Sequence, residues 1–519
     1  MLDASRHKGL ILTQKRLSHF VLSSATLLLL SGCGGGGGGG GDDSSGVKAS
    51  QTTPSIFISQ KAFNKFDAST FSASTCTNLP LETPTGIFVS LSGSSSASGT
   101  QADPLDLATA LSSSSPAQPG QTIWIEEGVY EGSFESELSG SAGQPISIKP
   151  LPGQRVLINS HNSGSDRAGL TITGQWTDFY GIEATSSDPY RGSITERYPN
   201  VEAKAGIAVF GANTNIYNAL TYDNVCGGID FWKTATDSTL HGNIIYNNGF
   251  AHSGRGACHG VYTQNTNGYK KLTNNIVFFG FQTGFHPYST KTAPLNNFTI
   301  ENNVWFLAGA SDPRDGQQKT NLIVETQAGI KNMVIKNNKG YSQVNRGSSI
   351  NARNSQGNVE IRDNYLAERL EVYGDWDPIT FINNTIYGNI DDADNSLIPD
   401  ASNTLSTSKP TFGNKVFVDA NGVDKRRGRV TIYNYDNADT VSVDLSSILK
   451  NGEAFRIHSV MGLFQEALLS GVYHTGDAIS IPMGTIDPPQ PNGNPNGIDA
   501  DDGPKKKFGV FIVMHGGCQ

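Results

Sequence analysis

Hydrophobic and polar residues alternate in short runs through the middle of the chain, and each of these runs opens on a glycine. Three of them can be aligned residue by residue: Gly228–Trp232, Gly260–Gln264 and Gly284–Tyr288. Alternation with a period of two is typical of a β-strand that buries one face. Because the same short run recurs, the pattern predicts strands that stack in successive coils.

Each predicted strand is followed by a turn, a second apolar strand and an asparagine corner. The corner asparagines are Asn224, Asn243, Asn275, Asn303, Asn338, Asn364 and Asn384. Their intervals run from 19 to 35 residues, which is typical of a solenoid with loops of variable length. Asparagine tolerates the left-handed conformation of a sharp corner, and stacked side-chain amides can hydrogen-bond into a ladder. The pattern predicts a parallel β-helix with these asparagines at one corner.

The predicted β-helix begins with apolar segments at 122–125, 145–148 and 156–158. Before them, residues 104–111 have the spacing of a short amphipathic helix, for which Asp103 is the expected N-cap. A β-helix must cover the open end of its core, and we expect this helix to do so.

The pattern changes near the end of the chain, where short apolar strands continue without asparagine corners. These strands are predicted at 429–434, 441–445, 455–457, 478–481 and 508–513. They predict a small antiparallel β-sandwich. We therefore divide the chain into a leader at 1–33, a linker at 34–100, the β-helix at 101–395, a linker at 396–411 and the β-sandwich at 412–519.

Length and composition agree with this all-β organisation. The 519 residues suit two domains, and 59 glycines with only 16% charged residues suit many short strands and tight corners. The net charge of −9 leaves no basic footprint, so we expect no nucleic-acid partner.

The N-terminus has the pattern of a bacterial lipoprotein signal. Basic residues precede an apolar run at 20–30, which is shorter than the roughly twenty residues that span a bilayer, and Leu30-Ser31-Gly32-Cys33 follows. The alternative is an uncleaved membrane helix. We expect Cys33 to be cleaved and acylated, which would anchor the protein in the cell envelope, at the outer membrane or cell surface. Residues 34–41 then form a flexible glycine tether.

Two cysteines occupy the same position in consecutive coils. Cys226 and Cys258 each stand two residues before the glycine of a predicted strand. Stacked positions lie about 4.8 Å apart, within the Cα separation that a disulfide requires. Because an exported protein meets an oxidising compartment, we predict a Cys226–Cys258 disulfide, with two buried free thiols as the alternative. Cys76 and Cys518 have no predicted partner.

The first coils carry a family resemblance. The segment 124–130, followed by 143–146, is similar to the first coils of alginate and chondroitin lyases, and residues 103–395 resemble the pectate-lyase-like superfamily of right-handed parallel β-helices. The resemblance implies a polysaccharide substrate. The sequence has no counterpart of the lysine- and arginine-bearing catalytic motifs of those lyases. His286-Pro287-Tyr288 also differs from the Asp-Pro-His tripeptide of mannuronan epimerases, so the site has to be argued from geometry.

The resemblance implies that the strands with the opening glycines form the floor of the substrate groove. Parity then directs every second residue of these strands outward. One outward column reads Ala208, Asp230, Tyr262, His286, Ile323, Asn351 and Glu371, and the other reads Phe210, Trp232, Gln264, Tyr288, Glu325, Arg353 and Tyr373. His259 is expected to face inward, and Arg255, Lys270, Lys271 and Arg314 are expected on solvated loops.

These columns have the residue types of a sugar-binding surface. Aromatic faces stack on pyranose rings, while amide, carboxylate and guanidinium groups bind hydroxyls and carboxylates. The expected substrate-binding residues are Asp230, Trp232, Gln264, Tyr288, Glu325, Arg353 and Glu371. Two alternatives remain open: the aromatic residues can serve only to stiffen the sheet, and Glu325 with Arg353 can form a structural ion pair.

Three functions compete. A lyase that acts on uronates needs a base and an acid, and Tyr262 with His286, about 4.8 Å apart in adjacent coils, can supply them. A hydrolase needs two carboxylates about 5–5.5 Å apart for retention or about 6.5–9.5 Å apart for inversion. Asp230 and Glu325 are three coils or roughly 14 Å apart, which is too far, and Glu325 and Glu371 are two coils or roughly 10 Å apart, which is borderline for inversion. This spacing favours a lyase over a hydrolase or uronate epimerase. A non-catalytic glycan-binding lipoprotein is the third interpretation.

The expected partners follow from these functions. We expect a monomer that binds an acidic polysaccharide and meets a membrane through its lipid anchor. Lyases of this superfamily often use Ca²⁺, although no loop has the ligand spacing of a calcium site.

Overall fold

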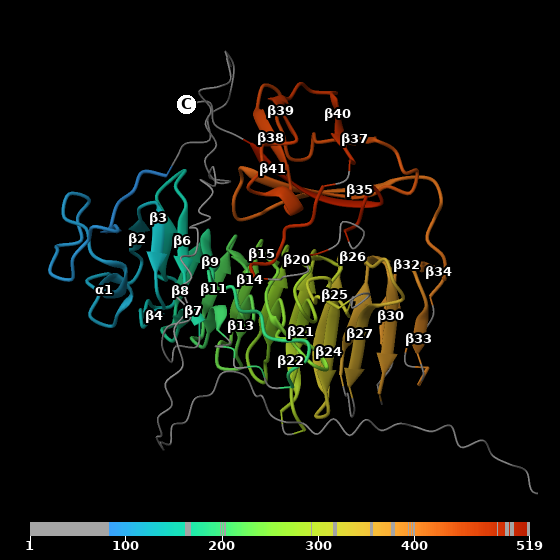
Figure 1. Ribbon diagram of the computed structural model, residues 1–519, viewed down its shortest axis with the longest axis horizontal. Helices are drawn as coiled ribbons and strands as arrows, with labels where there is room; N and C mark the ends of the chain where they lie inside the picture. Colours follow the sequence, from blue (N-terminus) through green and yellow to red (C-terminus); the bar gives the residue numbers. More distant parts are fainter. Residues whose placement is uncertain are drawn as a thin grey trace, which may run out of the picture. The chain divides into compact units, whose positions relative to one another are not determined.

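The computed structural model describes residues 82–519 apart from 161–167, 198, 200, 202–203, 292, 315–318, 353–356, 375–378, 393, 396, 398–399, 485, 494–497, 499–502 and 516–519. Cys33, Cys76, Arg353 and Cys518 therefore lie outside the described residues, as do the predicted leader and most of the predicted linker after it. Within the described ranges, the chain winds through three parallel sheets (Figure 1). Each complete coil contributes one strand to each sheet, and β1 and β34 belong to incomplete coils at the two ends.

The first sheet precedes the asparagine corner in each coil. Its eleven strands are, in spatial order, β1 (Ile87–Val89), β2 (Thr122–Ile125), β5 (Ile146–Pro150), β8 (Thr177–Tyr180), β11 (Thr214–Tyr217), β14 (Ser238–His241), β19 (Lys270–Thr273), β22 (Leu295–Glu301), β25 (Ile330–Lys336), β28 (Val359–Arg362) and β31 (Thr380–Ile382).

The second sheet, which we call the wall sheet, carries the predicted site. Its ten strands are β4 (Phe134–Ser136), β7 (Ala168–Ile172), β10 (Ala205–Val209), β13 (Ile229–Phe231), β18 (Val261–Thr263), β21 (Phe285–Pro287), β24 (Leu322–Thr326), β27 (Gly347–Ala352), β30 (Arg369–Tyr373) and β33 (Ile390–Asp392).

The third sheet, which we call the covered sheet, follows the asparagine corner. Its eleven strands are β3 (Gly128–Glu131), β6 (Val156–Asn159), β9 (Ile182–Thr185), β12 (Leu220–Tyr222), β15 (Ile244–Tyr246), β20 (Ile276–Phe278), β23 (Val304–Phe306), β26 (Lys339–Tyr341), β29 (Tyr365–Ala367), β32 (Thr385–Tyr387) and β34 (Thr404–Ser406). The predicted right-handed parallel β-helix is thus confirmed, and inward residues of all three sheets form one continuous apolar core.

The asparagine ladder is confirmed for six of the seven predicted corners. In each step, the backbone N–H and the Nδ2 of one asparagine both donate to the Oδ1 of the next. The ladder consists of Asn243, Asn275, Asn303, Asn338, Asn364, Asn384 and a further member, Asn403. Asn224 was wrongly included. It lies at the other end of the covered sheet, where its Nδ2 donates to Asn248 Oδ1 at 2.9 Å.

The ends of the β-helix differ from the prediction. β1 pairs with β2, so the first coil begins inside the range expected to be a linker. β34 pairs with β32, so the last coil continues into the second expected linker, at 396–411. The helix α1 (Leu107–Leu111) is shorter than predicted, and its N-cap is Asp106 rather than Asp103. Asp106 is the N-cap because its carboxylate accepts a hydrogen bond from the backbone N–H of Thr109 at 2.8 Å.

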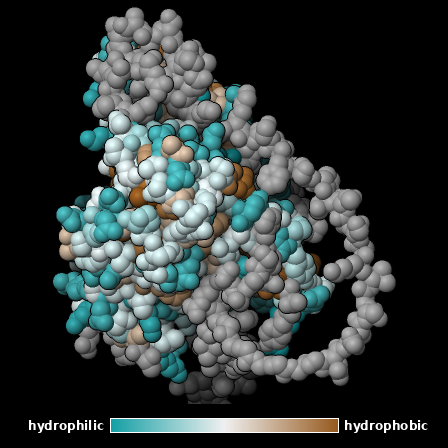
Figure 2. Space-filling model, turned by 90° about the vertical axis from the view of Figure 1, so that its left-hand side faces the viewer, coloured by the Kyte–Doolittle hydropathy of each residue, from teal (hydrophilic) through white to brown (hydrophobic). Residues whose placement is uncertain are grey.

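The helix α1 packs at the end of the core, since Leu107, Ala110 and Leu111 are buried in the main apolar cluster. Figure 2 looks at this end, where the described surface is mostly hydrophilic to neutral with small hydrophobic patches. None of the helices in the described ranges has the length and hydrophobicity needed to span a bilayer.

The C-terminal strands form two antiparallel sheets. The larger sheet contains, in spatial order, β35 (Lys415–Ala420), β36 (Arg427–Tyr433), β41 (Phe508–His515), β38 (Ala454–Ser459) and β39 (Leu469–Val472), and the smaller one pairs β37 (Thr440–Asp444) with β40 (Ala478–Pro482). A 3-10 helix, η2 (Val460–Gly462), follows β38. Apolar side chains from both sheets share one core, so the predicted small β-sandwich is confirmed.

The sandwich packs on the outer face of the covered sheet. The rings of Tyr341 and Phe508 stack with centroids 4.6 Å apart, and the Tyr433 hydroxyl donates to the Gly340 carbonyl at 3.0 Å. Arg429 donates to the Asn302 carbonyl at 2.8 Å, near the asparagine corner. These contacts bury one face of the β-helix and leave the wall sheet to present the predicted site residues.

Candidate active site

The outward residues of the wall sheet are aligned as predicted in the central coils. Asp230 pairs in register with Tyr262, and Tyr262 pairs with His286. The immediate neighbours of these residues along each strand, such as Phe231, point inward and are buried in the core. Since parity holds through these strands, Asp230, Tyr262 and His286 form one column on the outer face.

Ring contacts join the two columns into one aromatic surface. Trp232 stacks on Phe210 with ring centroids 5.7 Å apart and meets Tyr262 edge-on at 5.4 Å. Tyr288 lies 6.3 Å from Tyr262 and 5.2 Å from His286. These contacts agree with the alternative in which the rings stiffen the sheet. Because the side chains of Trp232, Tyr262 and Tyr288 are only partly buried, part of each ring also stays open to a ligand.

Tyr262 is the polar centre of this surface. Gln264 Nε2 donates to the Tyr262 hydroxyl oxygen at 2.8 Å, which leaves the phenolic proton to be donated elsewhere. Burial raises the pKa of Tyr262 to about 12. The phenol therefore keeps its proton at neutral pH and can act as an acid.

His286 forms a pair with His259, which was expected to face the core. His286 Nδ1 lies 3.0 Å from His259 Nε2, and the ring centroids are 4.3 Å apart. The expectation for His259 was wrong because β18 begins only at Val261, and Cys258, with a φ of 66°, turns the chain just before it. Strand parity does not extend through such a turn.

Both imidazoles of this pair are neutral. Burial, with a contribution from Arg255, lowers the pKa of His286 to about 3. Burial, with contributions from His286 and Arg255, also lowers the pKa of His259 well below its usual value. His286 Nε2 and His259 Nδ1 are enclosed and have no hydrogen-bond partner among the described residues. Each ring therefore has one nitrogen without a partner in the described ranges, and the surrounding protein covers both of these nitrogens.

Asp230 is a buried carboxyl group with no cation and no hydrogen-bond partner identified for it in the described ranges. Its side chain is about 9% exposed, and burial alone raises its pKa to about 7. Gly227 permits this placement, because a Cβ there would lie 2.3 Å from Asp230 Oδ1. In the central coils, Asp230 is thus a carboxyl that stays protonated up to near-neutral pH and can donate a hydrogen bond.

In the later coils, the observed register of β27 differs from the predicted one by two residues. Glu325 pairs with Asn351, and Asn351 pairs with Tyr373, so Asn351 takes the place expected for Arg353. The prediction that Arg353 stands opposite Glu325 is therefore wrong. Arg353 itself lies outside the described residues. The error arose because Ser348, rather than Ile350, stands opposite Leu322, and a serine at an inward position breaks the apolar pattern.

Glu325 and Glu371 differ in their surroundings. Glu325 stands opposite Tyr288 across an isolated bridge, and burial raises its pKa. Glu371 forms an ion pair with Arg369, which also contacts Asp391. Glu371 is therefore held by a neighbouring cation, whereas Glu325 extends the surface beyond Tyr288.

A disulfide fixes the two central coils. Cys226 and Cys258 are bonded, with Cα atoms 5.1 Å apart, as the aligned strands predicted. Between them in sequence, the antiparallel hairpin of β16 (Phe250–His252) and β17 (Arg255–Ala257) leads to His259. The bridge and the hairpin together set where His259 enters the site.

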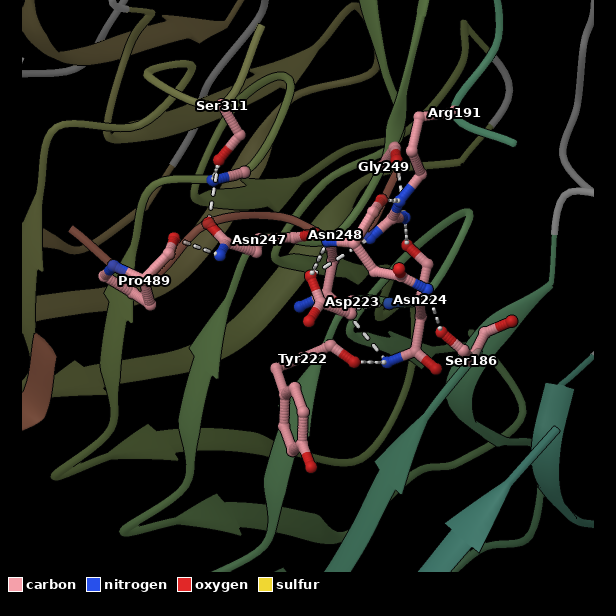
Figure 3. A network of polar contacts seen from close by, with 12 residues as sticks. Ser186, Arg191, Tyr222, Asp223, Asn224, Asn247, Asn248, Gly249, Ser311 and Pro489 are labelled. Carbon is pink, nitrogen blue, oxygen red and sulfur yellow. Dashed lines mark hydrogen bonds and ion pairs between the residues drawn. The ribbon is translucent and has the colours of Figure 1, made fainter. Parts of the chain in front are cut away.

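Arg191 holds the base of this hairpin (Figure 3). Its buried guanidinium pairs with Asp223 at 3.2 Å. It also donates to the carbonyl oxygens of Asn224, Asn247, Gly249 and Asn492. The backbone beside it bonds to the hairpin, with Ala251 N–H donating to the Arg191 carbonyl at 2.9 Å. One side chain thus joins two coils, the hairpin and the C-terminal part of the chain.

Lys270 is a buried support that the sequence interpretation placed on a solvated loop. It lies in β19, and its Nζ donates to the carbonyls of Phe231 at 2.8 Å and Trp232 at 2.5 Å. Burial lowers its pKa well below the usual value. Lys270 alternates with Leu272, and this spacing indicated an inward position. The position was missed because a lysine is expected on the solvent-exposed face of a strand. Lys270 anchors the end of β13 that presents Trp232.

Metal binding has no specific support within the described ranges, where no group of three or more His, Cys, Asp or Glu side chains could hold an ion.

Comparison with known proteins finds likeness in structure. No family model matches the sequence, and no curated protein matches it. Pectate lyase Pel9A is 18% identical over 63% of this chain and 81% of that chain, with a TM-score of 0.42. GH136 lacto-N-biosidase from Eubacterium ramulus is 12% identical over 62% of this chain and 67% of that chain, with a TM-score of 0.40. Alginate lyase from Paenibacillus sp. str. FPU-7 is 18% identical over 55% of this chain and 96% of that chain, with a TM-score of 0.31.

Proposed function

We propose that this protein is a polysaccharide lyase that cleaves a uronate-containing polysaccharide by β-elimination on the wall sheet. The observation that carries the proposal is the neutral His286–His259 pair beside the protonated phenol of Tyr262 and the buried carboxyl of Asp230. A base, an acid and a neutral hydrogen-bond donor are thereby gathered on one partly exposed aromatic surface.

The proposed chemistry assigns one task to each group. His286 is the proposed base: movement of the side chains that cover Nε2 lets it take the proton from the carbon next to the uronate carboxyl. Its pKa rises when a substrate carboxylate comes near. As that C–H bond breaks, a C=C bond forms and the bond to the leaving glycosidic oxygen breaks. Tyr262, whose ring centroid lies 5.9 Å from that of His286, protonates the leaving oxygen. Both groups regain their starting states by exchange with water.

The uronate carboxylate must also be stabilised while charge builds up next to it. Protonated Asp230 can donate a hydrogen bond to it without adding a negative charge. Arg255, on the hairpin that leads to His259, is a cation whose charge helps to lower the pKa of both histidines, and it can also attract the uronate carboxylate. Trp232 and Tyr288 offer ring faces on which sugar units can stack.

Hydrolysis by a carboxylate pair is less well supported. Asp230 and Glu325 are separated by three strand spacings, roughly 14 Å, beyond the 6.5–9.5 Å that inversion requires. Glu371 is occupied by Arg369.

The test is turnover of a panel of uronate-containing polysaccharides, followed by the ultraviolet absorbance of the unsaturated product. Wild type is compared with His286→Ala and Tyr262→Phe, and with two matched controls, His474→Ala and Tyr269→Phe, at exposed positions elsewhere. We expect product from wild type and both controls only. Binding without product in wild type would favour a glycan-binding protein, and reducing ends without unsaturated product would favour a hydrolase.

We also propose that the protein is anchored in the cell envelope through a lipid on Cys33, as its N-terminal pattern predicts. Metabolic labelling with a radioactive fatty acid should label the wild type but not Cys33→Ala. Labelling of the variant, or its absence from the wild type, would contradict the anchor.

A further inference from the structure

A groove lies along the outer side of the covered sheet at the last coils. Strands β29, β32 and β34 form one side of it, and residues 408–417, which lead into the sandwich, form the other. Its volume is about 830 Å³, and its lining includes Tyr365, Tyr387, Lys409, Phe412, Lys415 and Phe417. No residue of the proposed active site lines it.

The aromatic lining has a fixed part and an open part. Tyr365 meets Phe417 edge-on at 5.3 Å and Tyr387 at 5.8 Å, so these three rings hold one another. Phe412 is about 79% exposed and has no ring contact among the described residues. Phe412 therefore presents a ring face to solvent on which a ligand can stack.

The groove also has an exposed cation. Lys415 is exposed, and its Nζ lies 5.2 Å from the centroid of the Phe417 ring. Lys409 is partly buried, and its Nζ donates to the Ser342 carbonyl at 2.5 Å. The carboxylates nearby already have partners: Asp363 pairs with Arg362 at 2.8 Å, and Asp436 accepts the backbone N–H of Gly413 at 2.7 Å.

We propose that this groove is a second binding site for the acidic polysaccharide, separate from the site of cleavage. Phe412 and Tyr387 stack on sugar rings, while Lys415 binds a uronate carboxylate. The class of ligand rests on the proposed function, but the site itself rests on the groove, its open aromatic ring and its exposed lysine. Such a site would hold a polymer on the protein while another stretch of it reaches the wall sheet.

The experiment measures binding of polygalacturonate and of alginate by affinity electrophoresis, with dextran as an uncharged control. Wild type is compared with the double variant Phe412→Ala/Lys415→Ala. A matched control is Tyr269→Ala/Lys271→Ala, which also removes one exposed ring and one lysine, with Lys271 Nζ 4.9 Å from the Tyr269 ring centroid. At least one of the acidic polymers should bind about tenfold more weakly to the groove variant and within about twofold of wild type to the control. The groove variant should also show a smaller loss of affinity when salt is added.

The outcomes separate this inference from the proposed function. Binding that depends on Phe412 and Lys415 without any turnover would support the groove and overturn the lyase. Turnover that depends on His286 and Tyr262, with binding unchanged in the folded groove variant, would support the lyase and overturn the groove. Equal loss in the groove variant and the control, or a loss shared by dextran, would also overturn the inference, because neither is specific to an acidic ligand at this place.

Discussion

Asp230→Asn should remove a pH-dependent cost from the folded state. Burial raises the pKa of Asp230 from 3.8 to about 7. Between these two values, the unfolded chain has lost the proton while the folded chain keeps it. Stability therefore falls as the pH rises through this window, and the fall is complete above the folded pKa. A pKa rise of this size corresponds to a loss of about 4 kcal/mol of folding stability, of which about 3 kcal/mol is lost between pH 5 and pH 8.

The assay is urea-induced unfolding at pH 5 and at pH 8, for wild type and Asp230→Asn. Other buried carboxyls with raised pKa values, such as Glu368 and Asp223, are common to both proteins. For each protein, we take the change in the free energy of unfolding between pH 5 and pH 8. The difference between these two changes therefore isolates the contribution of Asp230. Wild type should lose about 3 kcal/mol more than the variant on going to pH 8. Asp444→Asn, at an exposed position, should follow wild type.

The same titration should appear in activity. Above about pH 7, ionised Asp230 repels a uronate carboxylate, so wild-type activity should fall, whereas Asp230→Asn should retain a larger share of its own maximum. Parallel unfolding profiles for wild type and variant, differing by less than about 1 kcal/mol between the two pH values, would refute the reasoning. Asp230 would then be an ordinary ionised carboxylate and not a hydrogen-bond donor at neutral pH.

Two further predictions concern the frame that holds the site. Asn303→Ala should lower the free energy of unfolding by about 3–5 kcal/mol in urea melts, because it strands the amide of Asn275 and the carbonyl of Leu272 inside the corner; a loss below about 1 kcal/mol would contradict a structural ladder. Cys226→Ala/Cys258→Ala should cost about 4 kcal/mol, the entropy of a loop with a sequence separation of 32; peptide mapping of non-reduced wild type that finds free thiols at these positions would contradict the bridge.

The fold could be predicted because its two signals are local and repeated. Glycine-led alternation marked the wall strands, and the ladder asparagines marked the corner after them. Asn224 was assigned to the wrong corner because an asparagine also fits the corner after the covered sheet. Sequence alone does not tell the two corners apart. Strand β34 was missed because its alternation is short and all three of its residues are exposed.

The candidate site was predicted where strand parity applies and was incomplete elsewhere. Asp230, Tyr262 and His286 follow from parity, and their column is present. His259 enters from a turn, to which parity does not extend, and Lys270 enters from a strand of the neighbouring sheet. The pKa shifts of Asp230 and His286 depend on burial by other coils, so no local pattern could have indicated them.

The most direct test of the central claim is the steady-state rate of unsaturated product formation from uronate-containing polysaccharides by wild type and His286→Ala. The account predicts product from wild type on at least one such polymer. In the variant, the rate constant should fall by a factor of about 10² or more, the usual contribution of a positioned general base. An unchanged rate in folded His286→Ala would contradict the account and place the chemistry on another surface of the protein.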